Sequence, residues 1–140
     1  MQHSYLHHIY LQNTYENPIG VENRTKIFIQ RIDKIIYKNL DNEAFNVAFL
    51  ANKVNLSVSQ LNRKLKHITG QPAGKIIRNY RMKHAAHLIA NDIASISEVA
   101  YQVGYMNHSH FCRSFKREYG CTPSQYSKKY ITDYKLLSPK

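Results

Sequence analysis

The stretch HSHFCRSFKREYG, residues 108–120, brings together histidines, a cysteine and basic side chains that could bind a metal, attack a substrate or hold an anion. Its spacing is helical, because Phe111, Phe115 and Tyr119 recur every four residues and so form one stripe. At ~100° per residue, Arg113 lies about 200° around the helix from Phe111 and points away from that stripe. We therefore expect a helix that is anchored by its aromatic stripe and presents a basic face.

Metal binding is the first chemistry to weigh. His108 and His110 are two residues apart and diverge on a helix, whereas His84 and His87 are three apart and could converge. The sequence places no third ligand near either pair, and catalytic zinc sites normally use three protein ligands. We therefore expect neither a metal ion nor another cofactor.

Cys112 could act as a nucleophile, since Arg113 and Lys116 would favour its thiolate. No histidine–carboxylate pair accompanies it, so a small residue on a contact surface is the simpler interpretation, and we expect no enzyme activity. Cys112 and Cys121 are the two cysteines of the chain, and they make a poor disulfide framework. Both are predicted to be free thiols in a reducing compartment.

The charge of the chain is strongly one-sided. Its 140 residues include 20 Lys and Arg against 9 Asp and Glu, which gives a net charge of +11. This excess favours a polyanionic partner, either nucleic acid or an anionic membrane surface. No run approaches ~18 uncharged apolar residues, and MQHSYLHHIY lacks the pattern of a signal peptide. We expect a soluble, cytoplasmic protein that inserts into no membrane.

The apolar spacing predicts an all-α fold. Residues 1–24 have no sustained period and contain the turn sequence ENPIG, so they are predicted to be a flexible tail or linker. From the cap residue Thr25, an Ile-rich helix is expected over about 25–39, and it could pack on its own domain or pair with a second chain. Three more helices are predicted: a short one capped by Asn46, one capped by Ser57 and closed by Gly70, and a longer one from Pro72 to about Asn91.

The helical pattern then recurs. Apolar residues of 50–56 reappear 49 residues later, and residues of 61–70 reappear 50 residues later, so the one-residue drift falls between them in a turn. Asn55 and Gly104 occupy this turn in the two copies, and both residue types tolerate positive φ. The recurrence predicts two helix-turn-helix units joined by one helix.

A resemblance to the AraC/XylS family of transcription regulators is carried by the segment SISEVAYQVGYMNHSHFCRSFKREYGCTPSQY. The earlier segment FLANKVNLSVSQLNRKLKHITGQPAGKIIRNYRMKHAAHLI is similar to the first unit and connecting helix of the same family, and the likeness covers about residues 27–130. The resemblance implies an all-α fold of two helix-turn-helix subdomains on a central helix. Here these would be residues 25–92 and 93–130, with a C-terminal tail over 131–140.

The resemblance also implies that each unit inserts a recognition helix into the major groove of a double-stranded DNA operator. A central helix of about 18 residues spans ~27 Å, against ~34 Å between consecutive major-groove faces. Base contacts would then come from Ser59, Asn62 and Arg63, and from His108, Ser109, His110, Cys112 and Arg113. Phosphate contacts would come from Lys64, Lys66, Lys116 and Arg117.

Arg63 and Arg113 are the strongest of these candidates, because a guanidinium can donate two hydrogen bonds to guanine. The two copies are expected to contribute unequally. The family often has Asp-Pro where this chain has Asn107 and His108, and the missing proline loosens the start of the second recognition helix. Phe49 also departs from the family pattern, which often has an acidic surface residue at this position. We favour packing of Phe49 under the 25–39 helix over a role in a protein-contact patch.

Family habit further implies RNA polymerase as a partner and activation of transcription. Nothing in residues 1–26 could form the β-rich ligand domain of many family members, so the chain is most similar to output domains that follow receiver domains in hybrid two-component regulators. A small stand-alone regulator is the other form. The alternative function is an all-helical, basic protein-interaction module that does not read DNA sequence.

Overall fold

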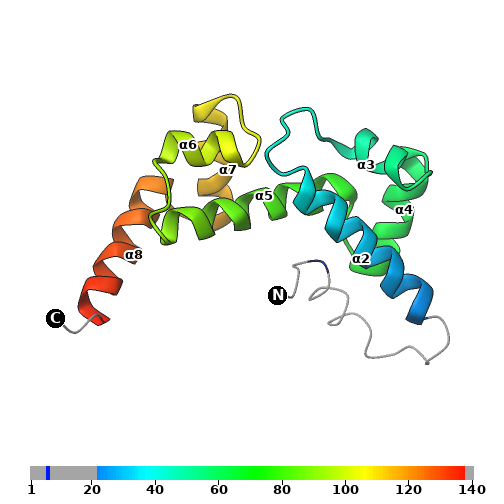
Figure 1. Cartoon of the computed structure of the whole chain (residues 1–140), viewed down its shortest axis with the longest axis horizontal. Coiled ribbons are helices and arrows are strands. Elements are labelled where there is room, and N and C mark those ends of the chain that lie inside the picture. Colours follow the sequence, from blue (N-terminus) through cyan, green and yellow to red (C-terminus); the bar gives the residue numbers. More distant parts are fainter. Residues whose placement is uncertain (1–5, 7–21, 138–140) are drawn as a thin grey trace. The chain divides into compact units, whose positions relative to one another are not determined.

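The computed structural model describes residue 6 and residues 22–137, with the backbone alone described for Glu22 and 131–137. Every element from residue 22 to 137 is a helix, which confirms the predicted all-α fold (Figure 1). The helices are α2 (Glu22–Lys38), α3 (Val47–Lys53), α4 (Val58–Thr69), α5 (Ala73–Ala90), α6 (Ile96–Gln102), α7 (His108–Tyr119) and α8 (Pro123–Leu137).

The chain folds into two units, each of which includes one part of α5. The first unit contains α2, α3, α4 and α5 as far as Tyr80. The second contains the segment Leu40–Ala44, α5 from Arg81 onward, and α6, α7 and α8. The sequence pattern predicts a boundary after residue 92, whereas the structure divides the connecting helix near its middle and assigns the Leu40–Ala44 segment to the second unit.

In the first unit, α2 packs into the core. Its Ile29, Ile32 and Ile36 are buried, so the Ile-rich face lies against its own unit. Tyr80 of α5 reinforces this packing, because its hydroxyl donates a hydrogen bond to Asp33 Oδ1 of α2 over 2.5 Å. Of the two arrangements that the sequence left open for this helix, packing within its own unit is the one observed.

One local expectation for the first unit differs from the structure. Thr25 is not a cap, because α2 begins three residues earlier, at Glu22. Phe49 is half-buried, and its ring meets Phe45 edge-on with centroids 5.3 Å apart, while Lys53 Nζ lies 5.6 Å from its centroid. One edge of the Phe49 environment is therefore Phe45, and the expected packing of Phe49 under α2 stays a prediction.

Arg81 explains why Leu40–Ala44 belongs to the second unit. This arginine is 7% exposed, and its Nη1 donates hydrogen bonds to the carbonyl oxygens of Leu40 (2.8 Å) and Val103 (2.6 Å). Its Nη2 donates to the carbonyl oxygen of Asn42 over 3.3 Å. Burial lowers the pKa of the Arg81 guanidinium, and nearby Tyr105 acts in the opposite direction. One buried side chain thus fastens the segment to the turn after α6.

The core of the second unit is assembled from α5, α6 and α7. α8 adds Tyr126, whose ring lies 5.3 Å from that of Phe115 and 4.5 Å from that of Tyr130. The helical backbone of α8 continues to Leu137, where the sequence pattern predicts a tail from residue 131. The buried apolar side chains of this core include Met82, Ala85, Leu88, Ile89, Val99, Ala100, Val103, Phe111 and Phe115.

The turns of the two units are alike, as the repeat predicts. Asn55 has φ +57° and Gly104 has φ +86°, so both occupy the left-handed region. Gly70 and Gly120 end α4 and α7 with φ +76°. At the other end of α7, Asn107 Oδ1 accepts the backbone N–H of His110 over 2.9 Å, which confirms the cap. Both helices thus begin at a side-chain cap and end at a left-handed glycine.

Candidate DNA-binding surface

The two predicted recognition helices, α4 and α7, are each anchored by one buried face. α4 buries Leu61 and Leu65, and α7 buries Phe111 and Phe115 at the corresponding positions. The aromatic stripe predicted for α7 is therefore a core feature. Ten of the twelve predicted contact residues are exposed, and the two that are partly buried are Asn62 and Cys112. Each helix consequently offers a polar, basic face.

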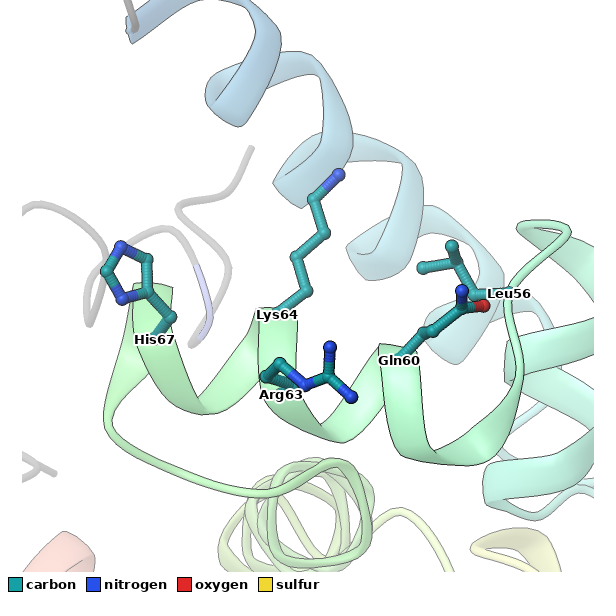
Figure 2. Close-up of a pocket in the computed structure, with 5 residues that line it drawn as sticks. All are labelled: Leu56, Gln60, Arg63, Lys64 and His67. Carbon is teal, nitrogen blue, oxygen red and sulfur yellow. The ribbon is translucent and has the colours of Figure 1, made fainter.

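On α4 this face borders a hollow of about 390 Å³ (Figure 2). Three of its lining side chains, Arg63, Lys64 and His67, carry or can carry positive charge, and Gln60 adds amide hydrogen-bonding groups. Residues 60, 63, 64 and 67 follow the spacing of one helix face. Leu56, in the turn before α4, completes the lining. A surface of this chemistry suits an anion that carries hydrogen-bonding groups.

Lys64 has a partner within the protein. Its Nζ lies 4.1 Å from the centroid of the Phe28 ring on α2, and Figure 2 shows the side chain extended toward that helix. A cation–π contact at an exposed site contributes roughly 0.5–1 kcal/mol. The structure therefore gives this predicted phosphate contact an additional role in holding α4 against α2.

Asn62 also has a partner within the protein. Its Oδ1 accepts the backbone N–H of Ala73 at the start of α5 over 2.9 Å, and the residue is only partly exposed. The side-chain oxygen that would accept from adenine therefore already accepts one hydrogen bond, and its second lone pair is left for another donor. This contact places Asn62 at the joint between α4 and α5.

We predict that Asn62→Ala lowers the free energy of unfolding by about 1 kcal/mol, because the Ala73 N–H at the helix start loses its acceptor. Urea denaturation followed by circular dichroism measures this loss, with exposed Ser59→Ala on the same helix as the neutral control. An Asn62→Ala chain with unchanged stability and a changed base preference would show that Asn62 reads a base and does not stabilise the start of α5.

His67 was missed by sequence reasoning. It lines the same hollow as Arg63, and the 50-residue offset that pairs Arg63 with Arg113 also pairs His67 with Arg117. Arg117 is a predicted phosphate contact, so the repeat itself contained the signal for His67. The basic set on α4 is therefore one residue larger than expected.

On α7, aromatic packing sets the position of one predicted contact. The His110 ring meets Tyr105 edge-on with centroids 5.3 Å apart, and Tyr105 in turn packs on buried Phe111 at 5.6 Å. Because Phe111 is fixed in the core, this chain of contacts orients His110 at the exposed start of the helix. Arg113, one turn further along, is fully on the exposed face.

The environment of Cys112 does not favour a reactive thiolate, the alternative that the sequence analysis set behind a small contact residue. Burial raises the pKa of its thiol, so the protonated form prevails at neutral pH despite the basic neighbours in sequence. Its Sγ lies 3.5 Å from Nε2 of His108, one turn earlier on α7. Both Cys112 and Cys121 are free thiols, as predicted. Around Cys112, α7 can therefore contact a partner through hydrogen bonds and complementary shape, and not through a reactive thiolate.

Metal-ligating and membrane-spanning features were also sought among the described residues. No three His, Cys, Asp or Glu side chains in that part of the chain come together as a metal site. His84 is half-buried, and burial, followed by the charge of His87, lowers its pKa. Within the same residues, no helix has the length and apolarity needed to cross a bilayer.

Comparison with known proteins places this architecture. A family model described as a helix-turn-helix domain matches residues 50–129. The chain is 31% identical over 106 residues to "Histidine kinase P4" of Formosa agariphila, a match over 76% of this chain and 8% of that protein. It is 31% identical over 101 residues to "HTH-type transcriptional regulator MtrA" of Neisseria gonorrhoeae, over 71% of this chain and 34% of that protein.

A solved structure agrees. The C-terminal domain of the two-component response regulator yesN from Fusobacterium nucleatum matches with a TM-score of 0.67 and 30% identity, over 70% of this chain and 95% of that domain. The chain thus spans a minor part of the length of the two curated relatives but nearly all of this isolated domain. The family match runs from within α3 to within α8 and so takes in most of the first helix-turn-helix unit and all of the second, and the chain belongs to the AraC-type helix-turn-helix family.

Proposed function

We propose that the chain is a sequence-specific DNA-binding transcription regulator that inserts α4 and α7 into major grooves of a double-stranded operator. The observation that carries this proposal is the duplicated arginine. Arg63 and Arg113 lie at the same repeat position, are exposed, and stand opposite the buried face of their helices. An isolated basic helix would be explained by solvation, whereas the same donor in both copies favours a shared, repeated ligand such as duplex DNA.

The contacts divide by chemistry. Arg63 and Arg113 would donate paired hydrogen bonds to guanine. Phosphate binding would come from Lys66 on α4 and Lys116 on α7, which share a repeat position, and from the matched pair His67 and Arg117. The remaining base contacts, from residues near the starts of the two helices and on the exposed face of α7, would be Ser59, His108, Ser109, His110 and Cys112.

The relatives support a proposal for the setting of the chain in the cell. The matched structure is the C-terminal domain of a response regulator, and the matched part of the histidine kinase is a small fraction of that protein. We propose that this chain is the output part of a two-component regulator, works in the cytoplasm, is preceded by a receiver or sensor domain, and activates transcription by positioning RNA polymerase. The basic surface would serve the operator, and polymerase would bind elsewhere.

Selection of bound duplexes from a random DNA pool at ~150 mM salt tests the central proposal, since nonspecific electrostatic binding is weakened at this ionic strength. The expected result is an enriched motif with two separate blocks of preferred bases. A protein-interaction module with a basic face would also bind DNA at low salt, but it would enrich no motif. Binding without any base preference would therefore refute sequence-specific reading.

A further inference from the structure

The turn before α7 is one residue longer than the turn before α4. In the first unit, the N–H of Leu56 donates a hydrogen bond to the carbonyl oxygen of Ala51 over 3.0 Å. In the second unit, the N–H of Tyr105 donates to the carbonyl oxygen of Ala100 over 2.9 Å. These matching bonds make Leu56 and Tyr105 equivalent. Ser57, the cap of α4, follows Leu56 directly, whereas one extra residue separates Tyr105 from the cap of α7. That extra residue is Met106.

Met106 contributes little to the folded core. It is 73% exposed, more than any other large apolar side chain among the described residues that are exposed. Its neighbour Tyr105 is held inward by contacts with His110 and Phe111, and its other neighbour, Asn107, is fixed as the helix cap. An apolar side chain is thus held in water at a defined place, immediately before a recognition helix.

The position of Met106 beside a proposed recognition helix and its apolar side chain together indicate which group of DNA it could contact. The N-terminal residues of a recognition helix are the ones that contact base edges in the major groove. The C5-methyl of thymine is the apolar group displayed there, and apolar side chains read it by contact. A methionine side chain is flexible and polarisable, so it can adapt to such a methyl group. A phosphate contact would instead call for a polar or basic residue.

We propose that Met106 is a specificity-determining residue that packs on the methyl group of a thymine in or beside the bases read by α7. This inference rests on the proposed DNA-binding function. It also makes the two units different readers, because the shorter turn before α4 has no residue in the place of Met106. The methyl preference belongs to the second block of the operator alone.

The test uses the duplex selected by the full chain, with each thymine replaced in turn by deoxyuridine, which lacks only the C5-methyl. One replacement in the α7 block is expected to weaken wild-type binding about three- to tenfold, the range for one buried methyl group in close contact. Replacements in the α4 block serve as the internal control and should change affinity less than twofold. Met106→Ser should bind the thymine and deoxyuridine duplexes equally, and Met106→Leu should retain the preference.

The outcomes distinguish a failure of methyl reading by Met106 from a failure of the proposed DNA-binding function. Block assignment comes from the Arg63→Ala and Arg113→Ala variants, which do not involve Met106. If a two-block motif is found but wild type tolerates every deoxyuridine, or Met106→Ser keeps the sensitivity, Met106 does not read a methyl group and the DNA-binding proposal stands. If no motif is enriched, both proposals fall. A thermal melt unchanged in Met106→Ser supports the expectation that an exposed side chain leaves the fold intact.

Discussion

Gly104→Ala is expected to destabilise the second unit by more than about 3 kcal/mol, because it combines a backbone penalty with loss of buried hydrogen bonds. Gly104 has φ +86°, and a Cβ there would lie 2.8 Å from the carbonyl oxygen of Leu40 and 1.7 Å from Nη1 of Arg81. The end of an arginine is normally free to move aside. Here Nη1 is held by two carbonyls, and displacing it would leave buried acceptors unsatisfied.

Gly120→Ala provides the matched control within the same unit. Gly120 has φ +76°, and a Cβ there would meet nothing within 4 Å, so only the left-handed backbone penalty of roughly 1–2 kcal/mol applies. Urea unfolding of both variants, followed by circular dichroism and tyrosine fluorescence, measures the difference. Equal losses for the two alanines would show that Arg81 moves without cost and that its hydrogen bonds to Leu40 and Val103 contribute little to stability.

The sequence could predict the glycine at this turn but not the arginine beneath it. The repeat places Asn55 and Gly104 at equivalent positions, and both residue types tolerate positive φ, so the turn was predictable from local chemistry. Arg81 lies 41 residues from Leu40 and 22 from Val103, and helical periodicity carries no information on such distances. The grouping of Leu40–Ala44 with the second unit accompanies this long-range contact, so the sequence pattern could not predict it.

The candidate surface shows the same division. Exposure of Arg63 and Arg113 follows from the apolar stripes opposite them, which local spacing reveals. Asn62 and Lys64 have partners on α5 and α2, and Cys112 owes its raised pKa to burial rather than to its basic neighbours. In each of these three cases the deciding group comes from the packed structure. The exposed face of each helix therefore follows from local spacing, whereas the internal partners of single residues do not.

The second large effect is expected in DNA reading. Arg63→Ala and Arg113→Ala should each weaken binding roughly 10- to 100-fold and relax base preference in one block, a different block for each variant. Each substitution would remove a pair of hydrogen bonds to guanine. Because both arginines are exposed, their replacement should leave the fold of the helix unaffected. Duplex selection with each variant, and titration of the wild-type operator, measure both quantities. Arginine-to-lysine changes should not restore the preference, because an ammonium lacks the forked geometry.

Lys66→Ala is the control that distinguishes reading from simple attraction. Lys66 is exposed on the same helix as Arg63. Because the lost contact would be to phosphate, Lys66→Ala should weaken binding to all duplexes alike and lower the salt slope by about 1. If Arg113→Ala behaved like Lys66→Ala, α7 would clamp the backbone without reading bases, and the unequal entry at Asn107 and His108 would be the structural reason. If it left affinity and preference unchanged, α7 would make no energetically significant arginine contact, and specificity would rest on α4 alone.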